Sequence, residues 1–233
     1  MLFRSNGINQ GHAVLDIIKA ARQIPGGPSF TSKDPVVIWG FSQGGQSAPW
    51  AGQLQANYMP DLNMVGVVAG GIPADLIAVG QNLDGGPGAC FLLCFYAGLY
   101  YQYPDEVPLF DLVNEKGQTA FNGAMDICLF DGLQQYMHVK TADFTRGGYS
   151  INDLLEKFPK ISERVESLKL GSLPINAPVY MYHGTADPFI PMAQALELRD
   201  AYCKMGMDVT FQVFPTAEHL IPLFQVTPYA LDW

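Results

Sequence analysis

The feature that most constrains this 233-residue chain is a short glycine-flanked segment between a strand-like and a helix-like stretch. Residues 40–44 have the sequence Gly-Phe-Ser-Gln-Gly, and the apolar, β-branched residues 36–40 predict a buried parallel strand. Residues 43–57 predict a helix. A strand that turns this sharply into a helix strains the backbone at Ser42, so the flanking positions must be small. The segment therefore predicts a tight turn that presents the Ser42 hydroxyl at the end of a strand.

An acidic residue follows a second strand of similar character. Residues 178–183 are apolar or aromatic and end at a glycine, after which Asp187 lies in a loop. A carboxylate in that position can leave the carboxyl edge of the sheet and reach an imidazole. The alternative is that Asp187 caps the helix expected over residues 191–205. Pro191 fits the first position of that helix, which would place the cap at Ile190 instead.

A histidine completes the set near the end of the chain. Residues 208–214 predict another strand, and His219 lies in the loop that follows it. It is the one histidine that comes after Asp187, which makes it the candidate base. We expect structural or solvated roles for the other three, with a structural hydrogen bond for the histidine within the second strand: His12, His138 and His183.

The three candidates occur in the order Ser, Asp, His, which is the order of α/β-hydrolases and differs from that of chymotrypsin or subtilisin. Ser42 is then the nucleophile, His219 the base, and Asp187 the acid that orients it. The backbone N–H of Gln43, at the helix N-terminus, is the first donor to an oxyanion, and the second donor is not identified. The positions that shape the turn are Gly40, Phe41 and Gly44.

These elements predict an α/β-hydrolase core, a mainly parallel sheet flanked by helices, with an inserted cap. We assign residues 1–72 and 171–233 to the core and residues 73–170 to a helical cap, because the core needs only a short connection there. We expect the cap helices to lie over Ser42. The cap is rich in Phe, Tyr and Leu, which form its own core or, collectively, an apolar pocket for an acyl chain.

Composition excludes several classes of function. Hydrophobic residues make up 48% of the chain and charged residues 15%, which is typical of a globular domain. The net charge of −9 argues against binding to nucleic acid or to anionic lipid. No apolar run is long enough for a membrane-spanning segment. Residues 1–4 lack the hydrophobic region of a signal peptide.

The cysteines are too few and too irregularly spaced for a disulfide framework, and no histidine lies at zinc-ligand spacing. We therefore predict no metal and no cofactor. One disulfide in the cap and buried free thiols are both compatible with the sequence. The cysteines are Cys90, Cys94, Cys128 and Cys203.

Several segments together have the pattern of a known family: residues 11–16 (Gly-His-Ala-Val-Leu-Asp), 40–44, 50–52 (Trp-Ala-Gly), 65–71 (Val-Gly-Val-Val-Ala-Gly-Gly) and 184–188 (Gly-Thr-Ala-Asp-Pro). With them the chain resembles the secretory lipases, the lipase-A-like branch of the α/β-hydrolases, as far as Trp233. The resemblance implies secretion and hydrolysis of triacylglycerols or other acyl esters through an acyl-enzyme. It assigns Ser42, Asp187 and His219 the roles given above.

Members of that family have further strands before the first helix and a longer last helix, so we expect a chain truncated at the N-terminus and slightly at the C-terminus. The loop that supplies the second oxyanion donor would then be missing. The strand before Ser42 would have an open, apolar edge, which favours homodimerisation or aggregation.

The expected partner is a small-molecule or lipid ester. One alternative is a truncated, weakly active or inactive fragment that binds an acyl ligand or a partner. Another is a serine peptidase or an acyltransferase that uses the same three residues.

Overall fold

The computed structural model describes residues 6–27, 30–124 and 127–233. The chain divides into two compact units. The sheet unit consists of residues 7–74 and 170–233, and the helical unit consists of residues 75–169 together with Asn6. Each unit is described separately below.

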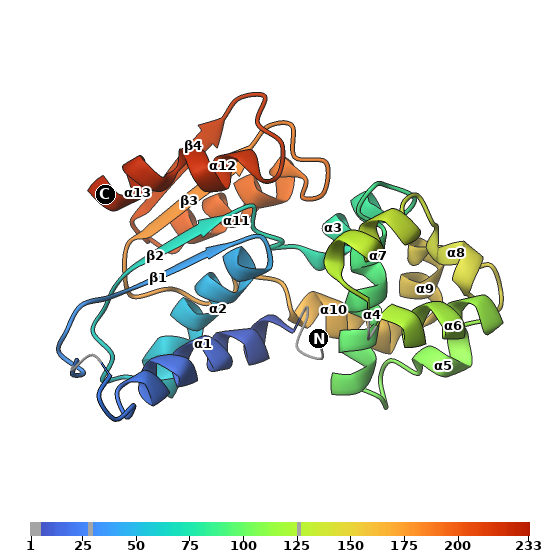
Figure 1. The fold of residues 1–233 in the computed structure, drawn as a ribbon, viewed down its shortest axis with the longest axis horizontal. Coiled ribbons are helices and arrows are strands. Elements are labelled where there is room, and N and C mark those ends of the chain that lie inside the picture. Colours follow the sequence, from blue (N-terminus) through green and yellow to red (C-terminus); the bar gives the residue numbers. More distant parts are fainter. Residues whose placement is uncertain (1–5, 28–29, 125–126) are drawn as a thin grey trace. The chain divides into compact units, whose positions relative to one another are not determined.

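The sheet unit contains a parallel sheet with the strand order β1-β2-β3-β4, so the predicted parallel sheet is confirmed (Figure 1). Each strand follows its spatial neighbour in the chain, and all four strands therefore have their carboxyl ends at the same edge. The strand bounds are β1 (Val36–Phe41), β2 (Met64–Gly70), β3 (Val179–Gly184) and β4 (Val209–Phe214).

Helices pack on both faces of this sheet. One face buries apolar side chains against α1, α2 and α11, and the opposite face buries a smaller cluster against α12 and α13. In Figure 1, α1 and α2 lie below the strands and α12 and α13 above them. The helix bounds are α1 (Gly7–Ala21), α2 (Gln43–Tyr58), α11 (Met192–Lys204), α12 (Ile221–Gln225) and α13 (Thr227–Asp232).

The inner and outer strands differ in burial. Every residue of β3 is buried, as expected for a parallel strand that is covered on both faces. In β1, by contrast, Val37 is 51% and Trp39 is 39% exposed. Within the described residues β1 pairs with β2 alone, which leaves its other edge open.

Short helices make up the helical unit, and its core lies where α4 meets α6 and α7. The sequence of α4 is apolar around its whole circumference, and it has no fully exposed residue before Tyr101. Among the described residues, no helix combines the length and the hydropathy needed to cross a membrane. The helix bounds are α3 (Leu76–Leu83), α4 (Cys90–Gln102), α5 (Leu109–Leu112), α6 (Glu115–Ala124), α7 (Leu129–Gln135), α8 (Thr141–Phe144), α9 (Ile151–Lys157) and α10 (Pro159–Ser167).

The close approach of α2 to the sheet depends on one glycine. A Cβ atom at Gly45 would lie 2.2 Å from the carbonyl oxygen of Gly70, at the end of β2. A contact that short is possible only if the helix or the strand moves. Gly45 therefore permits the packing distance that holds the start of α2 beside the carboxyl ends of β1 and β2.

We expect Gly45→Ala to destabilise the protein by about 1–3 kcal/mol, because the added methyl group overpacks a backbone contact. The matched control is Gly44→Ala, where a Cβ would have no neighbour within 4 Å, so the expectation that this flanking position must be small does not hold for Gly44. That change removes a helical glycine and should stabilise the protein by about 0.5–1 kcal/mol. Urea unfolding of both variants measures the difference, and equal midpoints for the two would contradict the packing argument.

Candidate active site

Ser42 occupies the turn between β1 and α2 in a strained backbone conformation. Its φ of 58° and ψ of −118° lie outside the regions that residues with a side chain favour. Such strain costs about 1–3 kcal/mol and persists only where the surrounding structure enforces it. The Ser42 N–H donates to the Gly70 carbonyl at 2.9 Å. A Cβ at Gly40 would lie 1.9 Å from the Gly44 carbonyl oxygen, which explains the glycine at position 40.

Asp187 lies in the loop after β3 and uses both carboxylate oxygens. Oδ1 accepts hydrogen bonds from the backbone N–H groups of Phe189 and Ile190, each at 2.9 Å. Oδ2 accepts from Nδ1 of His219 at 2.6 Å. The alternative that Asp187 caps the following helix does not hold, because α11 begins at Met192. The expected cap at Ile190 is also wrong by one residue, since Pro191 is the N-cap and not the first residue of the helix. The carboxylate instead closes a turn within its own loop.

His219 lies beyond the end of β4 and connects the other two candidates. Because the Asp187 carboxylate can only accept, Nδ1 of His219 carries the proton, and Nε2 is left as the acceptor. Nε2 lies 2.9 Å from Oγ of Ser42, within range of a hydrogen bond from the hydroxyl. The structure thus brings together the three residues that the sequence singles out, one from each of three loops at the carboxyl edge of the sheet.

Two aromatic rings flank the imidazole of His219. Its ring centroid lies 5.0 Å from that of Phe41 and 5.3 Å from that of Phe189. These contacts restrict rotation of the imidazole and keep bulk water from two of its sides. Phe41 is predicted from the sequence as part of the turn, whereas Phe189 is not, since its only local signal is its place two residues after Asp187.

The environment of Asp187 favours the charged carboxylate. Burial raises its pKa, but the hydrogen bond and charge of His219, with the amides of Ile190 and Phe189, outweigh burial and hold the pKa below its ordinary value. The side chain is only 2% exposed. A buried anion held by three donors is suited to orient an imidazole and to stabilise its protonated form.

The start of α2 offers a site for developing negative charge. The helix begins at Gln43, and the first amides of an α-helix have no acceptor within the helix. They therefore carry a partial positive charge beside Ser42. The backbone N–H of Gln43 stays a prediction as an oxyanion donor, and the second donor stays unassigned.

None of the other three histidines belongs to the chain of hydrogen bonds from Ser42 to Asp187, although His183 lies close to it. His12 packs its ring against Tyr58, with centroids 4.3 Å apart, and Nδ1 of the exposed His138 lies 3.0 Å from the Gly85 carbonyl oxygen. His183 is fully buried in β3, and its Nε2 lies 2.9 Å from the Ile190 carbonyl oxygen. A hydrogen bond of this kind is what the sequence suggests for His183.

No disulfide joins the four cysteines in the described part of the chain: Cys90 is buried, Cys94 is half-buried, and Cys128 and Cys203 are exposed. In the part of the chain that the structure describes, no group of three or more His, Cys, Asp or Glu side chains could hold a metal ion.

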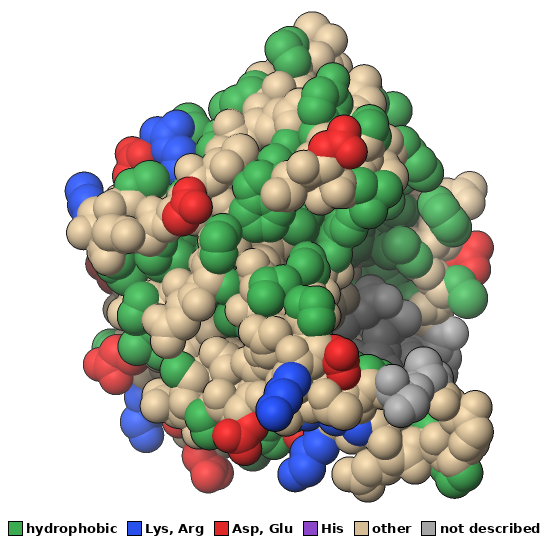
Figure 2. Space-filling view, turned by 90° about the vertical axis from the view of Figure 1, so that its left-hand side faces the viewer, with side chains coloured by type: hydrophobic (Ala, Val, Ile, Leu, Met, Phe, Trp, Pro, Cys, Tyr) green, Lys and Arg blue, Asp and Glu red, His purple; other side chains and the backbone are tan. Residues whose placement is uncertain are grey.

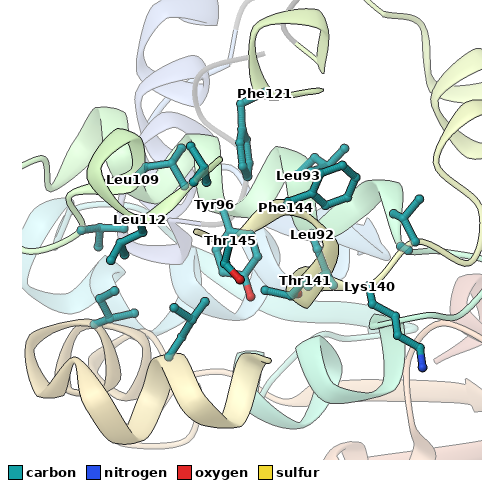
Figure 3. A pocket seen from close by; sticks show the side chains of 16 residues that line it. Leu92, Leu93, Tyr96, Leu109, Leu112, Phe121, Lys140, Thr141, Phe144 and Thr145 are labelled. Atoms are coloured by element: carbon teal, nitrogen blue, oxygen red, sulfur yellow. The ribbon is translucent and has the colours of Figure 1, made fainter. Parts of the chain in front are cut away.

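The helical unit contains a partly open apolar cavity of about 40 Å³ (Figure 3). That volume holds roughly three water-sized groups. Leu93, Tyr96, Phe121 and Phe144 are among the side chains that line it, and Figure 3 shows Lys140 at the margin with its amine directed away from them. The lining is suited to hydrocarbon rather than to polar groups.

Comparison with known proteins connects this geometry to a family. The chain matches the family model described as secretory lipase over residues 2–233. It is 33% identical over 208 residues to the secreted triacylglycerol lipase LIP5 of Malassezia furfur, a match that covers 88% of this chain and 54% of that protein. It is 31% identical over 238 residues to lipase 10 of Candida albicans, which covers 97% of this chain and 50% of that protein.

Solved structures show the same relationship. The crystal structure of Candida antarctica lipase A matches with a TM-score of 0.83 at 26% identity, covering 95% of this chain and 52% of that chain. The α/β-hydrolase fold that the sequence predicts is therefore confirmed. The chain spans about half the length of the relatives that it matches.

The pH dependence of stability should report the charge on Asp187. Its pKa in the folded protein is lower than the value of about 3.9 in an unfolded chain. The charged carboxylate therefore contributes stability that is fully present above that unfolded value and is lost as the pH falls through the folded pKa. Asp187→Asn cannot titrate, so we expect the difference in unfolding free energy between the wild type and this variant to narrow below about pH 4. A difference that stays constant from pH 6 to 3 in urea unfolding would contradict this.

Proposed function

Because this chain belongs to the secretory lipase family, we propose that it hydrolyses carboxylic esters, acylglycerols among them, through an acyl-enzyme on Ser42. The observation that carries the proposal is the continuous chain of hydrogen bonds from Ser42 through His219 to Asp187. The printed names of the relatives, which include triacylglycerol lipases, support an ester of a fatty acid as the substrate.

In the first half of the reaction, Oγ of Ser42 attacks the ester carbonyl carbon while its proton passes to Nε2 of His219. Asp187 accepts the Nδ1 proton in a hydrogen bond and stabilises the imidazolium without itself taking the proton. The carbonyl oxygen becomes an oxyanion, which the amide of Gln43 and the N-terminus of α2 stabilise. As the tetrahedral intermediate collapses, the alcohol leaves with the proton from His219.

The second half repeats these steps with water in place of Ser42. Nε2 of His219 takes a proton from a water molecule, whose oxygen attacks the acyl carbon. The carbon–oxygen bond to Ser42 then breaks, the proton returns to Oγ, and the carboxylic acid leaves. Each step uses the imidazole in the tautomer that its hydrogen bond to Asp187 fixes.

The helical unit is the cap in this proposal, with its boundaries near residues 73 and 170, and its apolar cavity is by itself a candidate site for a hydrocarbon group. The near absence of polar groups from the cavity lining supports this role. A cavity of about 40 Å³ accepts only a few methylene groups as it stands.

Hydrolysis of p-nitrophenyl butyrate and p-nitrophenyl palmitate tests the proposal. We expect Ser42→Ala to abolish the activity and to prevent labelling by a fluorophosphonate probe. The matched control is Ser47→Ala on the same helix, because the Ser47 hydroxyl oxygen lies within hydrogen-bond range of Gln10 Oε1 and the Gln43 carbonyl oxygen and takes no part in the mechanism. This variant should keep its activity, and the ratio of the butyrate rate to the palmitate rate measures the acyl chain length that the protein prefers.

Activity that survives in Ser42→Ala would reject Ser42 as the nucleophile. A folded wild type that neither reacts with the probe nor hydrolyses either ester would instead favour the inactive, ligand-binding fragment. Cleavage of peptides in preference to esters would favour the peptidase.

We expect the open edge of β1 to associate two copies of the chain. Unpaired backbone groups beside exposed apolar side chains are a template for strand pairing. Val37 and Trp39 of β1 are side chains of this kind, at 51% and 39% exposed. On the face drawn in Figure 2, hydrophobic side chains gather mainly in the upper half, and charged side chains lie mainly below them and at the margins. We predict that Val37→Lys, on the free edge, shifts a dimeric or aggregating protein toward monomer in sedimentation experiments.

The control for that experiment is Val65→Lys, since Val65 is 43% exposed but lies on β2, which is paired on both sides. It should leave the association state unchanged. A monodisperse, cooperatively melting wild-type monomer would count against association through this edge.

A further inference from the structure

One buried ionisable side chain beside the site has no role in the mechanism above. His183 lies in β3, four residues before Asp187, and is 0% exposed. Its Nε2 lies 2.9 Å from the carbonyl oxygen of Ile190 and 3.7 Å from Oδ2 of Asp187. A histidine in a fully apolar position would be costly unless its N–H groups had partners.

The partners of His183 fix its tautomer and its charge. The Ile190 carbonyl can only accept, so Nε2 carries the proton. Nδ1 is buried and has no hydrogen-bond partner among the described residues, which fits the unprotonated nitrogen of a neutral ring. Burial lowers the pKa of His183, and the charge of His219 acts in the same direction, against the raising effects of the Ile190 carbonyl and of Asp187.

The hydrogen bond from His183 acts on the residue that holds the carboxylate. Ile190 donates its N–H to Oδ1 of Asp187 at 2.9 Å, and its carbonyl accepts from His183. Hydrogen bonds therefore hold both the N–H group and the carbonyl group of Ile190. Without the bond from His183, the loop from β3 to α11 would lose one hydrogen bond between its far end and the strand.

We propose that His183 is a positioning residue for Asp187: its neutral imidazole holds Ile190 so that the amides of the loop and the N–H of His219 meet the carboxylate in a fixed geometry. The inference rests on the proposed function. A neutral ring suits this role better than a positively charged side chain would. A buried cation at this position would pair with the Asp187 carboxylate and compete with His219 for it.

The alternative is that His183 only fills space in the core. It shares a face of β3 with Met181, which is also 0% exposed. Met181 belongs to the apolar core that includes side chains of α1, α2 and α11. A purely packing role would be shared by these two positions. The positioning role belongs to the N–H donor of His183 alone, and this difference defines the variants.

The first test compares His183→Leu, which removes the donor, with His183→Gln, which can keep an N–H near Ile190. Removing a residue that orients a metal-binding histidine typically costs about 10–100-fold in activity, and we take the same range for a residue that orients a catalytic carboxylate. We expect His183→Leu to lower kcat by that amount with little change in KM, and His183→Gln to restore most of it. Met181→Ala is the control, with lower thermal stability but nearly unchanged kcat for the folded protein. Equal losses in His183→Leu and His183→Gln would overturn the proposal.

A double-mutant cycle separates positioning from a general structural defect. If His183 acts through Asp187, His183→Leu should change the rate of fluorophosphonate labelling less than about threefold when Asp187→Asn is already present. The same fold-loss in both backgrounds would overturn the proposal.

A measurement that does not depend on turnover distinguishes failure of the positioning proposal from failure of the proposed function. The proton between Nδ1 of His219 and Asp187 should give a far-downfield NMR resonance. We expect this resonance to disappear or shift in His183→Leu and to remain in His183→Gln. An unchanged resonance in folded His183→Leu would overturn the proposal whether or not the wild type hydrolyses esters. A wild type that lacks activity but loses the resonance in His183→Leu would instead reject the proposed function alone.

Discussion

The common direction of the four strands determines where every reactive group of the sheet unit lies. Because β1, β3 and β4 are parallel, the loops that follow them all begin at one edge of the sheet. Ser42, Asp187 and His219 come from these three loops, and no local feature of the chain would bring them together otherwise. Long connections between parallel strands also leave room for a separate unit after β2 without disturbing the edge.

Packing at that edge is tight enough to impose strain. Ser42 has a positive φ because the chain must leave β1 and enter α2 within one residue. The strain persists because α2 lies directly against the end of β2, where Gly45 meets the Gly70 carbonyl. Burial of α2 between α1 and the sheet supplies the stabilisation that offsets this local cost. The position of the Ser42 hydroxyl therefore depends on helix packing several residues away.

The sequence predicts the strands, the tight turn and the three residues of the site because each depends on local pattern plus chain order. Continuous apolar runs identify β1 and β3, and position after a strand identifies Asp187 and His219. The hydrogen bonds around Asp187 were not predictable in the same way. They depend on how the loop folds back so that Ile190 faces both the carboxylate and His183, and no short pattern encodes that closure. The cavity of the helical unit cannot be predicted from the sequence either. Because α4 is apolar on all sides, its sequence does not show which side chains face the cavity.

The electrostatics of the site depend on two histidines that lie near one carboxylate but bind different acceptors. His219 donates directly to Oδ2 of Asp187, while His183 donates to a carbonyl and leaves its N–H dipole 3.7 Å from the same oxygen. If both rings were protonated, two cations would face each other in a buried region with one anion between them. Burial of His183 removes that state by lowering its pKa. The negative charge of Asp187 is thus left to act on His219, the one histidine that also reaches Ser42.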